Sequence, residues 1–180
     1  MTLKDVVRQL GRSIMRSAVR EAGRPTRRPA RRPASGGRGQ PDAASYAGDF
    51  TGTATATYDP QSDGDGDPGE IVWAWVPFEE DHARGKDRPV LVVGRSGGRL
   101  LALMLTSKDH DRDAADEQRH GRYWLDLGAG AWDRQGRPSE VRVDRVLQLD
   151  PSSVRREGAR LDRDRFDQVA QALRERHGWR

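Results

Sequence analysis

GKDRPVLVVGR, residues 85–95, carries the chain from charged residues into its most apolar run. The four consecutive apolar residues Val90 to Val93 predict a buried strand. Arg88 stands at the mouth of this strand, and Pro89 restricts its backbone. A charged side chain in this place is either a strand end with its head group in water or part of a functional site. The neighbouring segments are needed to distinguish a solvated strand end from a functional site.

Further strands are expected on both sides of this one. Residues 70–76, EIVWAWV, are β-branched and aromatic, which is typical of a strand. Residues 99–107, RLLALMLTS, follow an SGG turn at 96–98, and with residues 88–95 they predict a β-hairpin. The remaining expected elements are a charged loop at 77–87, a long polar loop at 108–121, a strand at 122–128 and one or two strands within 138–150.

Residues 161–179 predict a helix. Asp162 is a suitable N-cap, and Leu161 and Phe166 have the spacing of a hydrophobic staple. Gly178 is expected to end the helix. Several short strands followed by one helix indicate a mainly β fold class, with a small, strongly bent antiparallel barrel over residues 69–180.

The segment before residue 69 has a different composition. Residues 1–22 place apolar side chains at three- and four-residue spacing beside a basic stripe, which predicts a basic amphipathic helix. Residues 23–68, rich in proline, arginine and small polar residues, predict a disordered linker. Residues 1–40 hold 11 Lys and Arg against 2 Asp and Glu, a charge of +9, which leaves −5 for residues 41–180 out of the total of +4. The excess of positive charge therefore lies in residues 1–40 and does not indicate that the folded part binds nucleic acid.

Several classes of protein are excluded by composition. The chain has no cysteine, so it forms no disulfides or thiolate metal sites. No apolar run approaches the roughly 20 residues of a membrane span, and the N-terminal segment lacks the apolar core of a signal peptide. No glycine-rich phosphate loop follows a strand, and the four histidines are not paired at metal-ligand spacing. We expect a cytoplasmic protein with no cofactor, no metal and no membrane span.

The order of the segments resembles the PemK/MazF family of toxin endoribonucleases over about residues 69–175. The matching segments are, in chain order, Gly69–Trp73, Arg88–Val93, Thr106-Ser107 and Asp144. The resemblance implies an SH3-like barrel that forms homodimers and cleaves single-stranded RNA without a metal. It also implies neutralisation by a cognate antitoxin. The expected function is thus a sequence-selective endoribonuclease toxin of a toxin-antitoxin system.

The resemblance makes Arg88 and Thr106 the catalytic pair. A guanidinium remains charged at any working pH and presents forked donors to the phosphate oxygens that gain charge during attack by a 2′-hydroxyl. Neighbouring residues are expected to bind RNA: Arg84, Lys86, Ser107 and Lys108. Where the family often carries a glutamate before the arginine, this chain has Ala83, so His82 and His110 are the candidate general acids or bases.

Two other functions stay open at this point. Gyrase-poisoning toxins share the barrel and cleave nothing, so the domain could be a non-catalytic binding module. Alternatively, the basic helix could dominate, and the barrel would then be an adaptor for a membrane or a partner protein. Retention of the Arg88–Thr106 pair favours cleavage, because a pure binding module has no need of it.

Overall fold

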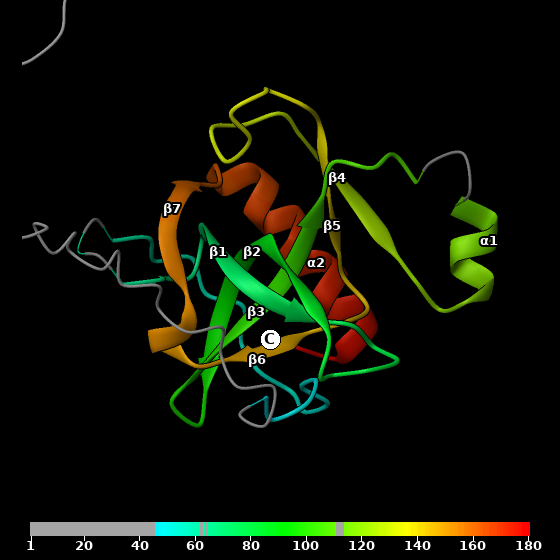
Figure 1. Ribbon diagram of the computed structural model, residues 1–180, viewed down its shortest axis with the longest axis horizontal. Helices are drawn as coiled ribbons and strands as arrows, with labels where there is room; N and C mark the ends of the chain where they lie inside the picture. The colour runs from blue at the N-terminus through cyan, green and yellow to red at the C-terminus, as the bar shows by residue number, and fades with distance from the viewer. Residues whose placement is uncertain (1–45, 62, 64, 111–113) are drawn as a thin grey trace, which may run out of the picture. The chain divides into compact units, whose positions relative to one another are not determined.

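The computed structural model describes residues 46–61, 63, 65–110 and 114–180 (Figure 1). The helix expected at 1–22 and the part of the linker expected before residue 46 lie outside these residues. The elements are β1 (Glu70–Pro77), β2 (Gly85–Ser96), β3 (Arg99–Thr106), α1 (Ala114–Arg119), β4 (Trp124–Gly128), β5 (Ser139–Arg142), β6 (Leu147–Leu149), the 3-10 helix η3 (Pro151–Ser153), β7 (Arg155–Arg160) and α2 (Arg163–His177).

The described strands form one antiparallel sheet. Its order is β4-β5-β3-β2-β1-β7, and β6 pairs with β3 beside this path. The sheet curls into a half-barrel, and α2 packs against one of its faces (Figure 1). The predicted fold class, a small antiparallel barrel with a C-terminal helix, is therefore confirmed.

The apolar run of β2 is buried because the sheet has a core on each face. Leu91 and Val93 point into the cluster that includes Phe166 of α2. Val90 and Val92 point to the other face and join a second cluster inside the curled sheet. Successive side chains of a strand alternate between faces, so only a strand covered on both sides accepts four apolar residues in a row. This is why the run stood out in the sequence.

Local signals in the turn and in α2 act as expected. Gly97 and Gly98 join β2 to β3 with φ angles of 57° and 78°, the left-handed conformation that a tight hairpin turn requires. The Asp162 carboxylate accepts a bond from the Arg165 N–H at 3.0 Å and caps α2, and Gly178 ends it with a φ angle of 65°. No described helix is both long and apolar enough to cross a membrane.

Residues 46–61 differ from the predicted linker, because they pack against the domain. The Phe50 N–H donates to the Val146 carbonyl at 2.8 Å, and the Tyr58 hydroxyl donates to the Leu161 carbonyl at 2.8 Å. Phe50 and Tyr58 both lie against the α2 side of the core. The backbone of this segment forms hydrogen bonds with the sheet and with Arg180. The domain therefore includes residues that the sequence assigned to a linker.

Three elements differ from the expectations: one strand begins earlier, and one strand and one helix were not expected. The second strand begins at Gly85, because the missing side chain there lets β1 approach closely, so Arg88 lies inside β2 and not at its mouth. β7 was not expected, since Arg155–Arg160 is charged, but as an edge strand paired with β1 it tolerates charge. The polar loop after β3 contains the short helix α1.

Candidate active site

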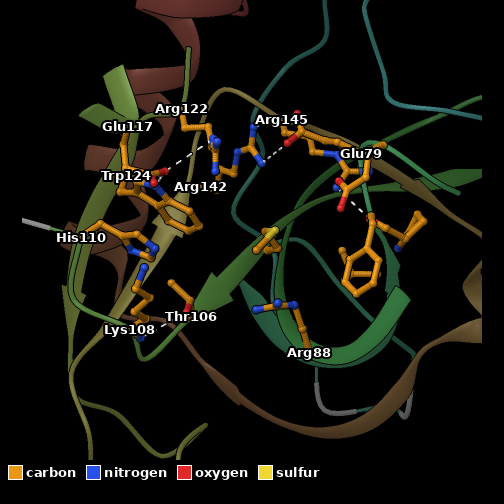
Figure 2. Close-up of a pocket in the computed structure, with 15 residues that line it drawn as sticks. Glu79, Arg88, Thr106, Lys108, His110, Glu117, Arg122, Trp124, Arg142 and Arg145 are labelled. Carbon is orange, nitrogen blue, oxygen red and sulfur yellow. Dashed lines mark hydrogen bonds and ion pairs between the residues drawn. The ribbon is translucent and has the colours of Figure 1, made fainter. Parts of the chain in front are cut away.

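A cleft opens where β2 and β3 part from one another. Their pairing ends at Val90 and Met104; two residues further along each strand come Arg88 and Thr106. From there Arg88 pairs with Ala74 of β1, and Thr106 pairs across the other side with β5. The gap between the two halves of the sheet is a cleft of about 280 Å³ (Figure 2).

Arg88 and Thr106 both line this cleft and face it from opposite strands (Figure 2). The Thr106 hydroxyl oxygen accepts a bond from the Lys108 N–H at 3.1 Å. Arg88 is half-buried, and no described residue hydrogen-bonds or ion-pairs with its guanidinium. The side chain therefore presents its donors to whatever occupies the cleft.

Pro89 is accommodated in a strand because of the same split. It pairs with Trp73 of β1 on one side, while the ladder with β3 begins only at the next residue. A proline cannot donate a hydrogen bond, so it is tolerated where a strand has one neighbour. The proline thus marks the point at which the sheet opens, and it stiffens the backbone of Arg88 beside the cleft.

His110 is a titratable group of the cleft that Glu140 and Trp124 hold in place. Its Nδ1 lies 2.8 Å from Glu140 Oε2, and its backbone N–H donates to Glu140 Oε1 at 3.1 Å. The ring stacks on Trp124, with centroids 4.1 Å apart and an angle of 2° between the planes. Both His110 and Glu140 are buried, and Glu140 pairs with Thr106 across the sheet.

Trp124 is held by α1 and the turn after it. Its Nε1–H donates to Glu117 Oε2 at 3.1 Å, and this bond holds the pKa of Glu117 below its ordinary value. Arg122 lies 3.6 Å from the same carboxylate. These residues form the wall of the cleft on the side of His110 (Figure 2).

Two buried arginines, Arg142 and Arg145, continue the lining of the cleft from Trp124, the cross-strand neighbour of Arg142, towards Glu79 (Figure 2). Arg142 makes two bonds to Glu79, at 2.7 and 2.9 Å, and also binds Asp144 at 2.7 Å. Burial disfavours the charged guanidinium, but the bonds to Glu79 and Asp144 outweigh it and raise the pKa of Arg142. The hydrogen bond from Arg142 in turn lowers the pKa of Glu79. Arg145 donates to the Pro77 carbonyl at 2.8 Å.

The structure brings together some of the predicted residues and leaves others outside. Arg88, Thr106, Lys108 and His110 line the cleft. The cationic heads of Arg84 and Lys86 lie 5.7 and 5.8 Å from the centre of the Phe78 ring, which itself lines the cleft.

His82 and Ser107 do not line the cleft. The ring of His82 lies edge-on to Tyr46, with centroids 5.1 Å apart, and Ser107 is exposed beside Thr106. Of the two candidate histidines, only His110 is therefore close to the expected catalytic pair.

Sequence reasoning missed the residues contributed from a distance along the chain. Glu140, Arg142 and Arg145 alternate with valines in a strand-like segment, and such charges read as a solvent-facing side. The structure buries all three. The only hint in the sequence was the large number of charged residues within the segment 138–150.

The comparisons with known proteins agree with this architecture. A family model described as PemK-like, MazF-like toxin of type II toxin-antitoxin system matches residues 67–176, more than half of the 180-residue chain. No curated protein matches the chain. Among the described residues, no group of three or more histidine, aspartate or glutamate side chains could hold a metal ion.

Proposed function

Because the chain belongs to the PemK-like, MazF-like toxin family of type II toxin-antitoxin systems, we propose that it cleaves single-stranded RNA at selected sequences without a metal ion. The observation that carries this proposal is the meeting of Arg88 and Thr106 across one cleft. Membership of the family implies an antitoxin partner. We place the reaction in the cytoplasm, where RNA and antitoxin are both present.

The chemistry assigned to the cleft is the attack of a 2′-hydroxyl on the adjacent phosphodiester. Charge builds on the phosphate oxygens during this attack, and Arg88 offers two donors to them at once. Thr106 donates its hydroxyl proton to the same phosphate, since its oxygen already accepts from Lys108. Donors placed in advance of the reaction avoid reorganisation, and each lowers the barrier by roughly 3–4 kcal/mol.

We assign the binding of RNA outside the reacting phosphate to the basic residues near the cleft. Lys108 lines it, and Arg84 and Lys86 lie over Phe78 at its edge. Ser107 is the exposed neighbour of Thr106 and adds a hydroxyl. These groups bind phosphates without regard to sequence, so they set affinity and its dependence on salt. We further propose that two copies form a homodimer, whose shared groove holds several nucleotides.

Arg88 variants test the proposal. Arg88→Ala should lower cleavage of a long single-stranded RNA in EDTA by about 100-fold or more, because it removes a donor to the transition state. Arg88→Lys should not restore it, because an ammonium group lacks the two-pronged geometry. Circular dichroism serves as the folding control for both variants.

Two outcomes would contradict this function. Near-normal cleavage by a folded Arg88→Ala protein would remove Arg88 from the mechanism. Wild-type protein that binds RNA or a partner but cuts no RNA would instead favour the non-catalytic binding module.

A further inference from the structure

Attack by a 2′-hydroxyl needs a group that takes its proton, and most carboxylates of the cleft are engaged elsewhere. Glu79 gives both oxygens to Arg142, and Glu117 binds Trp124 and Arg122. Glu80 also lines the cleft but is exposed on the loop after β1, and no described residue orients it. Under the function proposed above, we therefore expect the proton acceptor to be a group whose orientation is fixed by its neighbours.

His110 is held on three sides. Glu140 binds both its backbone N–H and its Nδ1, and Trp124 covers one face of the ring. The ring lines the cleft, whereas Glu140 lies behind it in β5. No described residue bonds to Nε2, so this nitrogen remains for a ligand in the cleft. The ring therefore cannot flip without breaking the Nδ1 bond to Glu140 and disturbing the stack on Trp124.

Glu140 also decides which ring nitrogen carries the proton. A carboxylate only accepts hydrogen bonds, so a neutral His110 must place its proton on Nδ1 to satisfy Oε2. Nε2 then carries a lone pair, on a ring that lines the cleft. Because Glu140 is the cross-strand neighbour of Thr106, the same pairing of β3 and β5 positions both the hydroxyl and the imidazole.

We infer that Glu140 is a positioning residue that makes His110 Nε2 the general base of RNA cleavage. Nε2 takes the proton of the 2′-hydroxyl while that oxygen bonds to phosphorus. The bond from phosphorus to the 5′-oxygen breaks, and the leaving oxygen takes a proton from water. The products are a 2′,3′-cyclic phosphate and a 5′-hydroxyl. The imidazolium, stabilised by the Glu140 carboxylate, then returns its proton to solvent.

Glu140→Gln gives the sharpest test, because it keeps the shape and reverses the tautomer. The glutamine oxygen is needed by the His110 backbone N–H, so its NH₂ group faces Nδ1. Nδ1 must then accept, which moves the ring proton to Nε2 and removes the lone pair from the cleft. We expect kcat on single-stranded RNA to fall about 100-fold, within the usual range for general base catalysis, with KM little changed.

Four variants accompany it. His110→Gln should lower kcat to the same extent, and the double variant should lose no more, because the two residues act as one unit. Asp126→Asn is the matched control: it removes a carboxylate that pairs with Glu140 across the sheet but bonds to the Gly128 N–H, and it should leave kcat unchanged. Glu80→Gln tests the remaining open carboxylate.

The tautomer itself is measurable in the wild-type protein, independently of any variant. The ¹⁵N chemical shifts of the neutral His110 ring, assigned by comparison with His110→Gln, should report a protonated Nδ1 and an unprotonated Nε2. In Glu140→Gln they should report the reverse. If Glu140→Gln does not fold, the wild-type spectrum still decides the point.

Each result has one meaning. A protonated Nε2 in the wild type overturns the inference, as does a folded Glu140→Gln protein with normal kcat. Loss of activity only in Glu80→Gln assigns the base to Glu80 and also overturns it. If the wild-type protein cuts no RNA at all, the proposed function fails, whereas the tautomer prediction is still tested by the spectrum.

Discussion

At the scale of single residues, the Thr106 hydroxyl has one of its two hydrogen-bonding functions already in use. Its oxygen accepts the Lys108 N–H at 3.1 Å, which closes a small turn at the end of β3. The hydroxyl proton is left for an acceptor in the cleft. Arg88 across the gap has no described partner. The two side chains are thus prepared as donors, which suits a phosphate that gains negative charge.

Replacing Thr106 separates its hydroxyl from its shape. Thr106→Val keeps the β-branched volume but has no proton to donate, so kcat for RNA cleavage should fall about 100-fold. Thr106→Ser keeps the hydroxyl and should retain most of the activity. Steady-state cleavage of a short RNA substrate measures both. Equal activity of the valine and wild-type proteins would show that the hydroxyl plays no part.

Part of the site could be predicted from single residues, and part depends on contacts distant in the chain. Arg88 and Thr106 lie within recognisable segments, and the structure places both in one cleft. The bond between His110 and Glu140 joins residues 30 positions apart, and no local pattern reports it. Glu79 and Arg142 meet across 63 positions for the same reason. Pairings of this kind follow from the register of the strands, which sequence periodicity alone leaves open.

At the scale of elements, the strands buried on both faces carry the clearest signal in the sequence. β1, β2 and β3 contribute apolar residues to both core clusters, and their nearly continuous apolar runs identify them. β7 lies at an edge of the sheet, where tertiary pairing with β1 outweighs its charged composition. Residues 46–61 contain few large apolar side chains, and the alternation of Ala54, Ala56 and Tyr58 was their only strand-like signal.

The loop between β1 and β2 is tied to β5 by the pair of Glu79 and Arg142. Arg142 is 7% exposed and Glu79 is 47% exposed, so solvent screens the pair on one side only. Glu79→Gln should lower the free energy of unfolding at neutral pH by about 1.5 kcal/mol, the lower end of the range for bonds to charged groups. Asp144 continues to pair with Arg142 and limits the loss.

The pH dependence of this loss has a definite sign. The pKa of Glu79 is lowered in the folded protein by the bond to Arg142, so its contribution to stability is present above the ordinary glutamate pKa. That contribution disappears as the pH falls through the lowered pKa. Urea unfolding at neutral and acidic pH should therefore show a smaller difference between Glu79→Gln and wild type in acid. A difference that stays constant or grows in acid would contradict the role given to the pair.

At the scale of the whole molecule, the described domain begins before the first strand. Residues 46–61 bond to Val146, Val93, Leu161 and Arg180, and their aromatic rings lie against the core. Phe50 packs edge-on to Trp179, with ring centroids 5.9 Å apart. The segment thus joins the sheet to the residues after α2 and acts as part of the fold.

Truncation at two points tests this extent. A fragment of residues 46–180 should unfold cooperatively and keep RNA cleavage. A fragment of residues 69–180 should be less stable by about 2–4 kcal/mol, because it exposes the surfaces covered by Phe50 and Tyr58. Thermal unfolding compares the two, and light scattering of the longer fragment should give the mass of two chains. Equal stability of the two fragments would restore the boundary at residue 69.

Mapping the ends of the products shows whether the protein cleaves RNA without a metal. The full chain is incubated with a long single-stranded RNA in EDTA, and the 5′ ends of the fragments are sequenced and their terminal groups identified. We expect cuts at a recurring short sequence, with 5′-hydroxyl ends and 2′,3′-cyclic phosphates. Cleavage that stops in EDTA and returns with magnesium, or fragments that carry 5′-phosphates, would contradict this expectation.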